Sequence, residues 1–143
     1  MVPQSRSATL NDCALLADLN YQLIRDQGHR NPSGPAELEE RMRGWLSSGE
    51  YRGRIFEDGA EVVAYALYRE TADEVHLRHF FVARGRRRQG IGRAAMKDLI
   101  ERHWPRTKRL TVSVLVRNEA GLAFWRALGY ADYDLTLEIL PRP

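Results

Sequence analysis

The sequence predicts an α+β domain built on a mixed, mostly antiparallel sheet with helices on its faces. Apolar residues recur at helical spacing in the first third of the chain and alternate at strand spacing from residue 51 onward. An Asp58-Gly59 pair, typical of a hairpin turn, separates two of the expected strands. The resulting element order is roughly β-α-α-β-β-β-α-β-α-β.

The first half of the chain is expected to supply two helices and three strands. Residues 11–27 carry an apolar stripe at helical spacing after Asn11 and Asp12, which can cap a helix. A Gly/Pro-rich break follows over residues 28–35, and residues 37–46 form a second helix that Gly49 ends. Residues 51–57, 62–69 and 75–83 are rich in aromatic and β-branched side chains, which predicts three strands.

The second half alternates between helix and strand. A helix is expected over residues 89–103, ending before Pro105, and a strand over residues 110–116. Asn118 can cap a last helix, and Gly129 stands where a helix-ending glycine belongs. The tail, residues 130–140, is expected to add one more strand or a hairpin.

Length and composition limit the classes of protein to consider. The 143 residues fit a single domain over 1–143, and 43% hydrophobic with 29% charged residues is typical of a globular chain. A net charge of +3 is too small to indicate nucleic-acid binding, and the sequence has no apolar run of roughly 20 residues for a membrane span. The amino terminus lacks the apolar core of a signal peptide, and the lone Cys13 fits a reducing compartment. A cytoplasmic location is therefore expected.

The most informative segment is the arginine-rich stretch from Arg84 to Arg93, which holds five arginines and no acid. It lies between a predicted strand and a predicted helix, and Gly90 and Gly92 allow its backbone to approach a ligand closely. The free N–H groups of the helix's first turn favour an anion there, and arginines add charge-assisted hydrogen bonds. The segment thus suits a diphosphate, although a solvated basic loop would have the same composition.

Other phosphate-binding and nucleic-acid-binding patterns fit less well. Gly90, Gly92 and Ala95 match a dinucleotide fingerprint, but the connection before them is long and no acid follows on the next strand to bind a ribose. No G-x-x-x-x-G-K-[ST] motif occurs. A nucleic-acid contact would need stacking aromatics near the arginines, and Phe80 and Phe81 are more typical of a strand core.

Spacing on both sides of the glycines gives a more specific resemblance. The run Arg87-Arg-Gln-Gly-Ile-Gly92 resembles the R/Q-x-x-G-x-G/A signature of the GNAT superfamily of N-acetyltransferases. Downstream, residues 118–130 resemble the family's second signature, N-x-x-A-x-x-F-Y-x-x-x-G-F. Together these signatures cover about residues 75–131, and the upstream element order also fits.

The resemblance implies a GNAT fold, with its sheet splayed at a site for acetyl-CoA and with no metal. The backbone of the splayed strand would pair with the pantetheine arm, the loop amides would bind the pyrophosphate, and the asparagine that caps the last helix would touch the pantetheine. The residues at these positions are Phe80, Phe81, Val82, Arg87, Arg88, Gln89, Gly90, Ile91, Gly92, Arg93 and Asn118. For Asn118, a plain helix cap is an equal and compatible interpretation.

The implied reaction is direct attack of a primary amine on the thioester of acetyl-CoA in a ternary complex. A protonated amine must lose a proton first, and His76, six residues before Val82, matches the base position of the histone-acetylating branch. His79 and Glu74 are alternatives, and an ordinary strand histidine is the plain interpretation of His76. Alternation puts His79 on the opposite face from His76 unless the strand contains a bulge. Cys13, on an amphipathic helix, is expected to be a buried small hydrophobe.

The sequence also departs from the family pattern. Trp125 stands where the usual general acid is a tyrosine, and an indole N–H cannot donate a proton at useful pH. Tyr130 or Tyr133 would have to replace it, or the thiolate leaves without help. Ser113 stands where some members have a glutamate base. A CoA-binding module without catalysis is therefore the alternative function.

The acceptor is expected to be a small-molecule or peptide amine, with no nucleic-acid or membrane partner. In the GNAT fold the first two helices and their connection shape the acceptor pocket, here roughly residues 21–45. That segment mixes arginines, histidines and acids and does not select one amine. A homodimer is a further expectation, since many members of the family are dimers.

Overall fold

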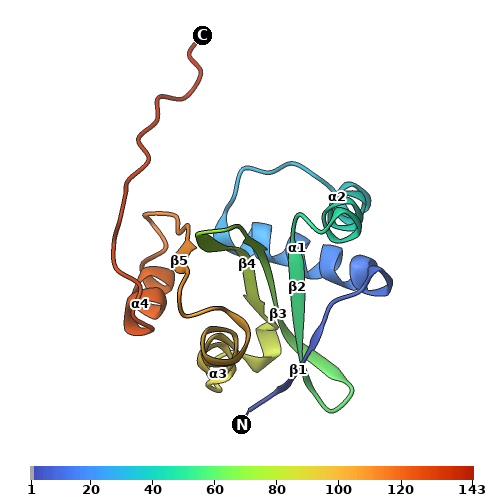
Figure 1. Cartoon of the computed structure of the whole chain (residues 1–143). Coiled ribbons are helices and arrows are strands. Elements are labelled where there is room, and N and C mark those ends of the chain that lie inside the picture. Colours follow the sequence, from blue (N-terminus) through green and yellow to red (C-terminus); the bar gives the residue numbers. More distant parts are fainter. Residues whose placement is uncertain (1) are drawn as a thin grey trace.

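The computed structural model describes residues 2–143 as an α+β domain with one five-stranded sheet. The strands lie in the order β1-β2-β3-β4-β5; the first three pairings are antiparallel, and β4 pairs with β5 in parallel (Figure 1). This confirms the predicted mixed, mostly antiparallel sheet. The strands are β1 (Gln4–Ser7), β2 (Arg52–Asp58), β3 (Glu61–Glu70), β4 (Glu74–Val82) and β5 (Arg109–Val112), and the helices are α1 (Cys13–Gln27), α2 (Pro35–Ser48), α3 (Ile91–Asp98) and α4 (Glu119–Ala127).

Helices cover both faces of the sheet (Figure 1). On one face, α1 and α2 bury Leu16 and Met42 against Ile55 and Tyr65 of the sheet. On the other, Ile91 and Met96 of α3 join a second apolar cluster, and α4 packs at its edge. Alternate residues of β2 and β3 point to the two clusters, so the central strands are buried on both sides.

The α3 region differs slightly from the helix predicted over residues 89–103. The α-helix covers Ile91–Asp98, and a π-helical turn over Leu99–His103 continues it to the extended Trp104. The predicted length of this helical segment was therefore nearly right, but the segment is not one regular α-helix.

A β-bulge in β4 changes which way its side chains point. Leu67 of β3 pairs with His79, while the next residue, Tyr68, pairs with Leu77, so Arg78 is an extra residue on β4. Leu77 and Phe80 consequently both face the α3 side, despite their odd separation. Arg78 and His79 both reach Trp45 of α2 on the other side.

The sheet opens between its last two strands. β5 pairs only with Glu74–Leu77, the first half of β4, and ends at Val112. Residues 113–116, predicted to continue this strand, leave the sheet and lie in a turn-containing connection. Residues 78–82 of β4 therefore have a strand partner on the β3 side alone, which is the splay expected of the fold.

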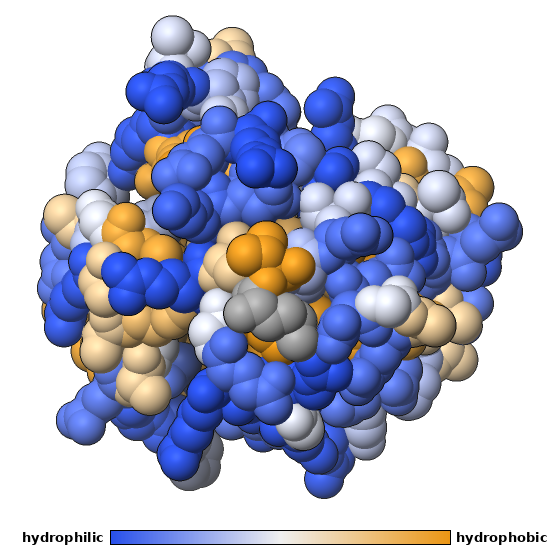
Figure 2. All heavy atoms as spheres, turned by 90° about the horizontal axis from the view of Figure 1, so that it is seen from below, coloured by the Kyte–Doolittle hydropathy of each residue, from blue (hydrophilic) through white to orange (hydrophobic). Residues whose placement is uncertain are grey.

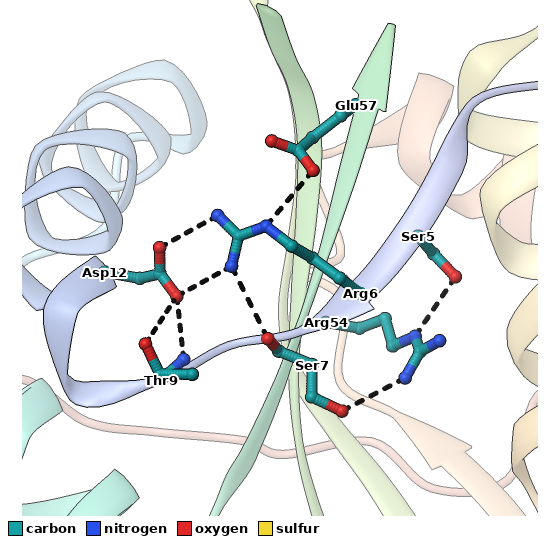
Figure 3. Close-up of polar contacts among 7 residues, drawn as sticks. All are labelled: Ser5, Arg6, Ser7, Thr9, Asp12, Arg54 and Glu57. Atoms are coloured by element: carbon teal, nitrogen blue, oxygen red, sulfur yellow. Dashed lines mark hydrogen bonds and ion pairs between the residues drawn. The ribbon is translucent and has the colours of Figure 1, made fainter. Parts of the chain in front are cut away.

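The short strand β1 is held at the other edge by a partly buried polar cluster (Figure 3). Both terminal nitrogens of Arg6 donate to the Asp12 carboxylate at 2.9 Å, and Arg6 Nε donates to Glu57 at 3.1 Å. The backbone N–H of Thr9 also donates to Asp12, at 2.7 Å. These bonds, the one from Arg6 first, hold the pKa of Asp12 below its usual range.

The predicted strand or hairpin over residues 130–140 is wrong. The tail after α4 has no regular structure and runs away from the domain (Figure 1). Its apolar residues do alternate, but Tyr133, Leu135, Leu137 and Ile139 are all at least two-thirds exposed. A strand needs a neighbour to pair with its N–H and C=O groups, and none of the five strands described in residues 2–143 pairs with the tail.

The face shown in Figure 2 is mostly hydrophilic, with apolar residues in small patches. Among residues 2–143, no helix has the length and apolar character required to cross a membrane.

Candidate active site

The arginine-rich loop ends in a cradle of unused backbone donors. Within residues 2–143, the backbone amides from Arg87 to Arg93 have no hydrogen-bond acceptor, and the first bond of α3 runs from Ala94 N–H to Gly90 C=O at 3.0 Å. Gly90 has the left-handed φ of 78° that glycine adopts without strain, and Arg88 has a φ of 62°. Consecutive free N–H groups at a helix start form an anion-binding concavity.

The five arginines of this segment divide into two groups. Arg84 and Arg87 both bind Asp26 of α1, at 2.5 and 2.7 Å, and Arg86 binds Asp58 and Glu61, each at 2.6 Å. These arginines attach the loop to the protein. Arg88 and Arg93 make no ion pair within the described chain, so their charges remain available to a ligand.

The three β4 residues assigned to the cofactor point their side chains into the protein. Phe80 stacks on Phe124 at 6.1 Å, Phe81 is 2% exposed, and Val82 packs against the α3-side core. The Val82 carbonyl accepts a hydrogen bond from Arg87 Nε at 2.9 Å. The backbone groups on the open side of β4 are therefore the part of this segment that can pair with an extended ligand, and the Phe80 residue also lines the cavity described below.

Asn118 caps α4 and also lines the cavity described below. Its Oδ1 accepts a hydrogen bond from Gly121 N–H at 2.9 Å. A Cβ at residue 121 would lie 2.4 Å from Asn118 Nδ2, so the cap requires glycine there. The two roles considered for Asn118 are therefore compatible.

A cavity of about 400 Å³ lies where β4 and β5 separate. The C-terminal half of α1, the chain that follows it and α2 form one side, and the residues after β5 with the start of α4 form the other. Among its lining residues are Asn20, His29, Arg30, Arg41, His76, Arg78, His79, Phe80, Ser113, Leu115, Asn118 and Trp125. The cavity brings together two of the three predicted base candidates, His76 and His79, and Glu74 does not line it.

His76 belongs to a hydrogen-bonded chain that determines its tautomer. Its Nδ1 lies 2.8 Å from the Thr111 hydroxyl, which lies 2.9 Å from Glu74 Oε2. The ionised carboxylate can only accept, so the single hydroxyl proton of Thr111 goes to Glu74. Thr111 must then accept from His76 Nδ1–H, which leaves the lone pair on Nε2. His76 is thus held with Nε2 free to take a proton.

Burial lowers the pKa of His76 below 6.5, opposed by the nearby Glu74 carboxylate. The imidazole is therefore neutral near pH 7 and able to act as a base. Burial, followed by the charges of Arg41 and Arg78, lowers the pKa of His79 to about 3. His79 is 7% exposed and lies 3.3 Å from the Tyr65 hydroxyl. It is too weak a base to compete with His76.

Glu74, the third candidate base, is occupied by other contacts. Its Oε2 accepts from Thr111 and lies 3.0 Å from Arg109. It is better placed to orient the Thr111–His76 pair than to remove a proton from a substrate.

No tyrosine replaces Trp125 as a proton donor among the described residues that line the cavity. Trp125 packs against Phe80 and Tyr130, with ring centroids 5.7 and 5.6 Å apart. Burial raises the pKa of Tyr130 to about 12, and its hydroxyl does not line the cavity. Tyr133 lies on the exposed tail beside Arg109.

Cys13 is completely buried in the core between α1 and the sheet. Burial raises the pKa of its thiol, so it remains a neutral small hydrophobe, as expected.

Sequence reasoning missed three contributors to this site. Asp26 was grouped with the acceptor region but binds the loop, and Thr111 was seen only as a strand residue. Arg41 was not singled out. Asp26 and Thr111 act on residues 35 or more positions away, a separation that a local pattern does not reveal.

Comparisons with known proteins agree with this fold. Residues 18–130 match the model of the acetyltransferase (GNAT) family. No match was found among curated protein sequences.

Solved structures with the same fold have low sequence identity to this chain. A possible acetyltransferase from Clostridium difficile 630 superposes with a TM-score of 0.79 at 17% identity, covering 100% of this chain and 99% of the other. A predicted acetyltransferase with acetyl-CoA from Clostridium acetobutylicum gives 0.76 at 17% identity, covering 96% and 95%. An aminoglycoside N-acetyltransferase in complex with CoA gives 0.74 at 14% identity, covering 98% and 95%.

Proposed function

The chain belongs to the acetyltransferase (GNAT) family, and from this premise we propose that it moves the acetyl group of acetyl-CoA to a primary amine by direct attack in a ternary complex. The observation that carries the proposal is the placement of three features along β4. The free amides of residues 87–93 follow its end, its middle is open on one side, and His76, whose Nδ1 is bonded to Thr111, lines the same cavity.

The residues suit coenzyme A along this path. The amides from Arg87 to Arg93 and the unpaired side chains of Arg88 and Arg93 would bind the pyrophosphate. The open backbone of Phe80, Phe81 and Val82 would pair with the pantetheine arm, and the Asn118 amide would add a contact at the cavity wall. The thioester then supplies an activated acetyl group at the His76 end.

In this proposal His76 is the general base. An alkyl amine has a pKa of about 10 and arrives mostly protonated, so a proton must leave before the nitrogen can attack. His76 Nε2 accepts it, directly or through one water, while Thr111 and Glu74 hold the ring. Backbone N–H groups of the open part of β4 stabilise the negative charge that develops on the thioester oxygen.

The leaving group does not require a tyrosine. The new N–C bond forms as the C–S bond breaks, and the sulfur leaves as a thiolate. A thiol has a pKa of about 8.5, so the thiolate is a moderate leaving group at neutral pH. His76, now protonated, can return its proton to the sulfur and regain the neutral form, and the second proton that the attacking nitrogen loses as the amide forms passes to solvent.

The test is an acetylation assay with acetyl-CoA and a broad panel of primary amines, following free thiol, together with a thermal shift measured with CoA. We expect CoA to stabilise the protein and at least one amine to release thiol. Replacing both Arg88 and Arg93 by Gln should weaken CoA binding, whereas the control Arg43→Gln on α2 should not. No stabilisation by CoA or acetyl-CoA would overturn the proposal.

A CoA-binding module without catalysis is the second candidate, favoured by Trp125 in place of the usual tyrosine. The same assay separates the two. CoA binding with no turnover of any amine would favour the module, and turnover that depends on His76 would favour the enzyme.

A further inference from the structure

Two arginines on the α2 side of the cavity lie against the same aromatic ring. The guanidinium carbon of Arg41, on α2, lies 4.5 Å from the centroid of a Trp45 ring, and that of Arg78, the bulge residue of β4, lies 4.7 Å from it. Arg78 also donates to the Tyr51 hydroxyl at 3.3 Å. Both arginines line the cavity that holds His76.

These two charges have no counter-ion. No Asp or Glu of residues 2–143 lines the cavity, and neither arginine has an ion pair in the described chain. Arg30, at the same cavity, is different, because it binds Glu138 of the tail at 2.6 Å. Arg41 Nε is buried without a hydrogen-bond acceptor, and burial followed by the nearby Arg78 lowers the pKa of Arg41. Two uncompensated cations at one cavity create a positive potential that an anion would neutralise.

A third group in the cavity wall also has unused hydrogen-bonding capacity. Asn20 of α1 is 0% exposed, yet neither its Nδ2 nor its Oδ1 has a partner in the described chain. A buried amide without partners is costly, so such groups are retained where a ligand or water satisfies them. Asn20 lines the cavity together with the two arginines.

The pyrophosphate of coenzyme A does not account for this charge. Its proposed cradle lies beyond the end of β4, at residues 87–93, and has its own unpaired arginines. Arg78 lies at the middle of β4, two residues from His76, where the acetyl group and the acceptor would meet. The anion recognised there must therefore belong to the acceptor.

Resting on the proposed function, we propose that the acceptor amine carries a carboxylate, which binds Arg41 and Arg78 while Asn20 hydrogen-bonds the same small molecule. The substrate class is an amino acid, α or ω, and not a polyamine or an aminoglycoside. Guanidinium groups recognise carboxylates by paired charge-assisted hydrogen bonds, and the same positive charge repels an acceptor with several amines.

The test compares acceptors that differ in the carboxylate alone. The panel holds the L-α-amino acids against their amides, ω-amino acids from glycine to 6-aminohexanoate against the corresponding n-alkylamines, and phosphoethanolamine and spermidine. We expect kcat/KM for the best carboxylate-bearing amine to exceed that of its uncharged partner by about ten- to a hundredfold, the range for a hydrogen bond to a charged group. Equal turnover of both partners, or preference for phosphoethanolamine or spermidine, would overturn the inference and leave the proposed function standing.

Substitutions of the two arginines test whether these side chains produce the preference for a carboxylate-bearing acceptor. Arg78→Gln changes an exposed side chain, so folding should be intact, and Arg41→Gln changes the half-buried one. Each should raise KM for the carboxylate-bearing amine about tenfold while leaving KM for acetyl-CoA unchanged. The control Arg43→Gln lies on the same helix, where Arg43 binds Glu39, and should change neither. Unchanged discrimination in Arg78→Gln and in folded Arg41→Gln would contradict the assignment.

A binding measurement keeps the inference testable if no amine is turned over. Calorimetry with N-acetylglycine and N-acetyl-L-leucine, against their amides, should show binding that depends on the carboxylate and weakens in Arg78→Gln. Such binding without turnover would support the anion site while the catalytic proposal fails. No carboxylate-dependent binding, in a protein that binds CoA, would reject the anion site.

Discussion

The carboxylate of Asp26 lies 2.7 Å from the guanidinium of Arg87, although 61 residues separate them in the chain. Asp26 is near the end of α1 and also binds Arg84, and these two arginines hold its pKa below the usual range. One carboxylate thus attaches the start of the amide cradle to the first helix. Because a flexible loop loses conformational entropy when it binds a ligand, prior attachment favours binding.

Asp26→Asn should therefore weaken the cradle. The amide cannot form an ion pair with the two arginines, so we expect KM for acetyl-CoA to rise about tenfold with a smaller change in kcat. Steady-state kinetics with acetyl-CoA varied at saturating amine give both values. Asp18→Asn, an exposed change on the same helix, is the control. Equal KM values in both variants would show that the ion pairs do not shape the cradle.

His76→Gln tests the base. Loss of a general base typically costs about a hundredfold or more in rate, so kcat should fall by that factor with KM for acetyl-CoA unchanged. Burial lowers the His76 pKa below 6.5. Wild-type kcat should therefore be constant near pH 7 and fall only below pH 6.5, as the imidazole gains a proton. The variant should lose this acid limb. His103→Gln, where the histidine binds Asp98 on α3, should retain both the rate and the limb.

Thr111 should act on the reaction through His76. Thr111→Val removes the acceptor that holds His76 in its Nδ1–H tautomer, so kcat should fall about tenfold, a fraction of the full general-base effect. The acid limb should also move, because the link to Glu74 is broken. Thr111→Ser keeps the hydroxyl and should restore rate and pH profile. A purely structural role would change stability in both variants and leave the limb in place.

The carboxylate of Asp12 should make the free energy of unfolding depend on pH. Asp12→Asn breaks the paired hydrogen bonds with Arg6, and we expect the free energy of unfolding at pH 7 to fall by about 2 kcal/mol, allowing for the partly exposed Arg6. The Asp12 pKa is lowered by folding, so this contribution is complete above the unfolded value of about 3.9 and disappears as pH falls through the folded value. Urea denaturation from pH 7 to pH 3 should show the two proteins converging. Asp134→Asn, on the exposed tail, should match wild type throughout.

Gly121→Ala should damage the cap of α4. The new Cβ would overlap the Asn118 amide, so the side chain must move and the cap be lost, at a cost of up to about 2 kcal/mol that outweighs the gain of up to about 1 kcal/mol from alanine within α4. Thermal denaturation should show a lower Tm. Gly44→Ala, in open space within α2, should raise Tm instead, because alanine favours helix by up to about 1 kcal/mol. Changes of the same sign in both variants would contradict the clash.

Local sequence patterns were sufficient to predict the elements and the family. Apolar spacing predicted α1, α2 and the three central strands nearly to their ends. The side chains that these elements bury in the core recur with the period of a helix or of a strand, and that period is visible in the sequence. The glycine-arginine segment predicted an anion cradle because glycine conformation and free amides are properties of a few adjacent residues. The strand predicted for the tail was wrong for the same reason. Alternation of apolar residues is a local property, but a strand needs a neighbouring strand that local sequence does not supply.

Tertiary structure alone decided what each charged side chain does. The same arginine segment contains loop anchors, Arg84, Arg86 and Arg87, and free cations, Arg88 and Arg93, and only the positions of Asp26, Asp58 and Glu61 separate them. The bulge at Arg78 brought His79 and Arg78 to the same side of β4. It also placed Arg78 beside Arg41 with no acid between them. The sequence by itself determined the fold and the glycine-arginine loop before α3. Contacts between distant residues decided which histidine is bonded to Thr111 and which arginines line the cavity without an ion pair, because electrostatic interactions depend on distance in space and not on distance along the chain.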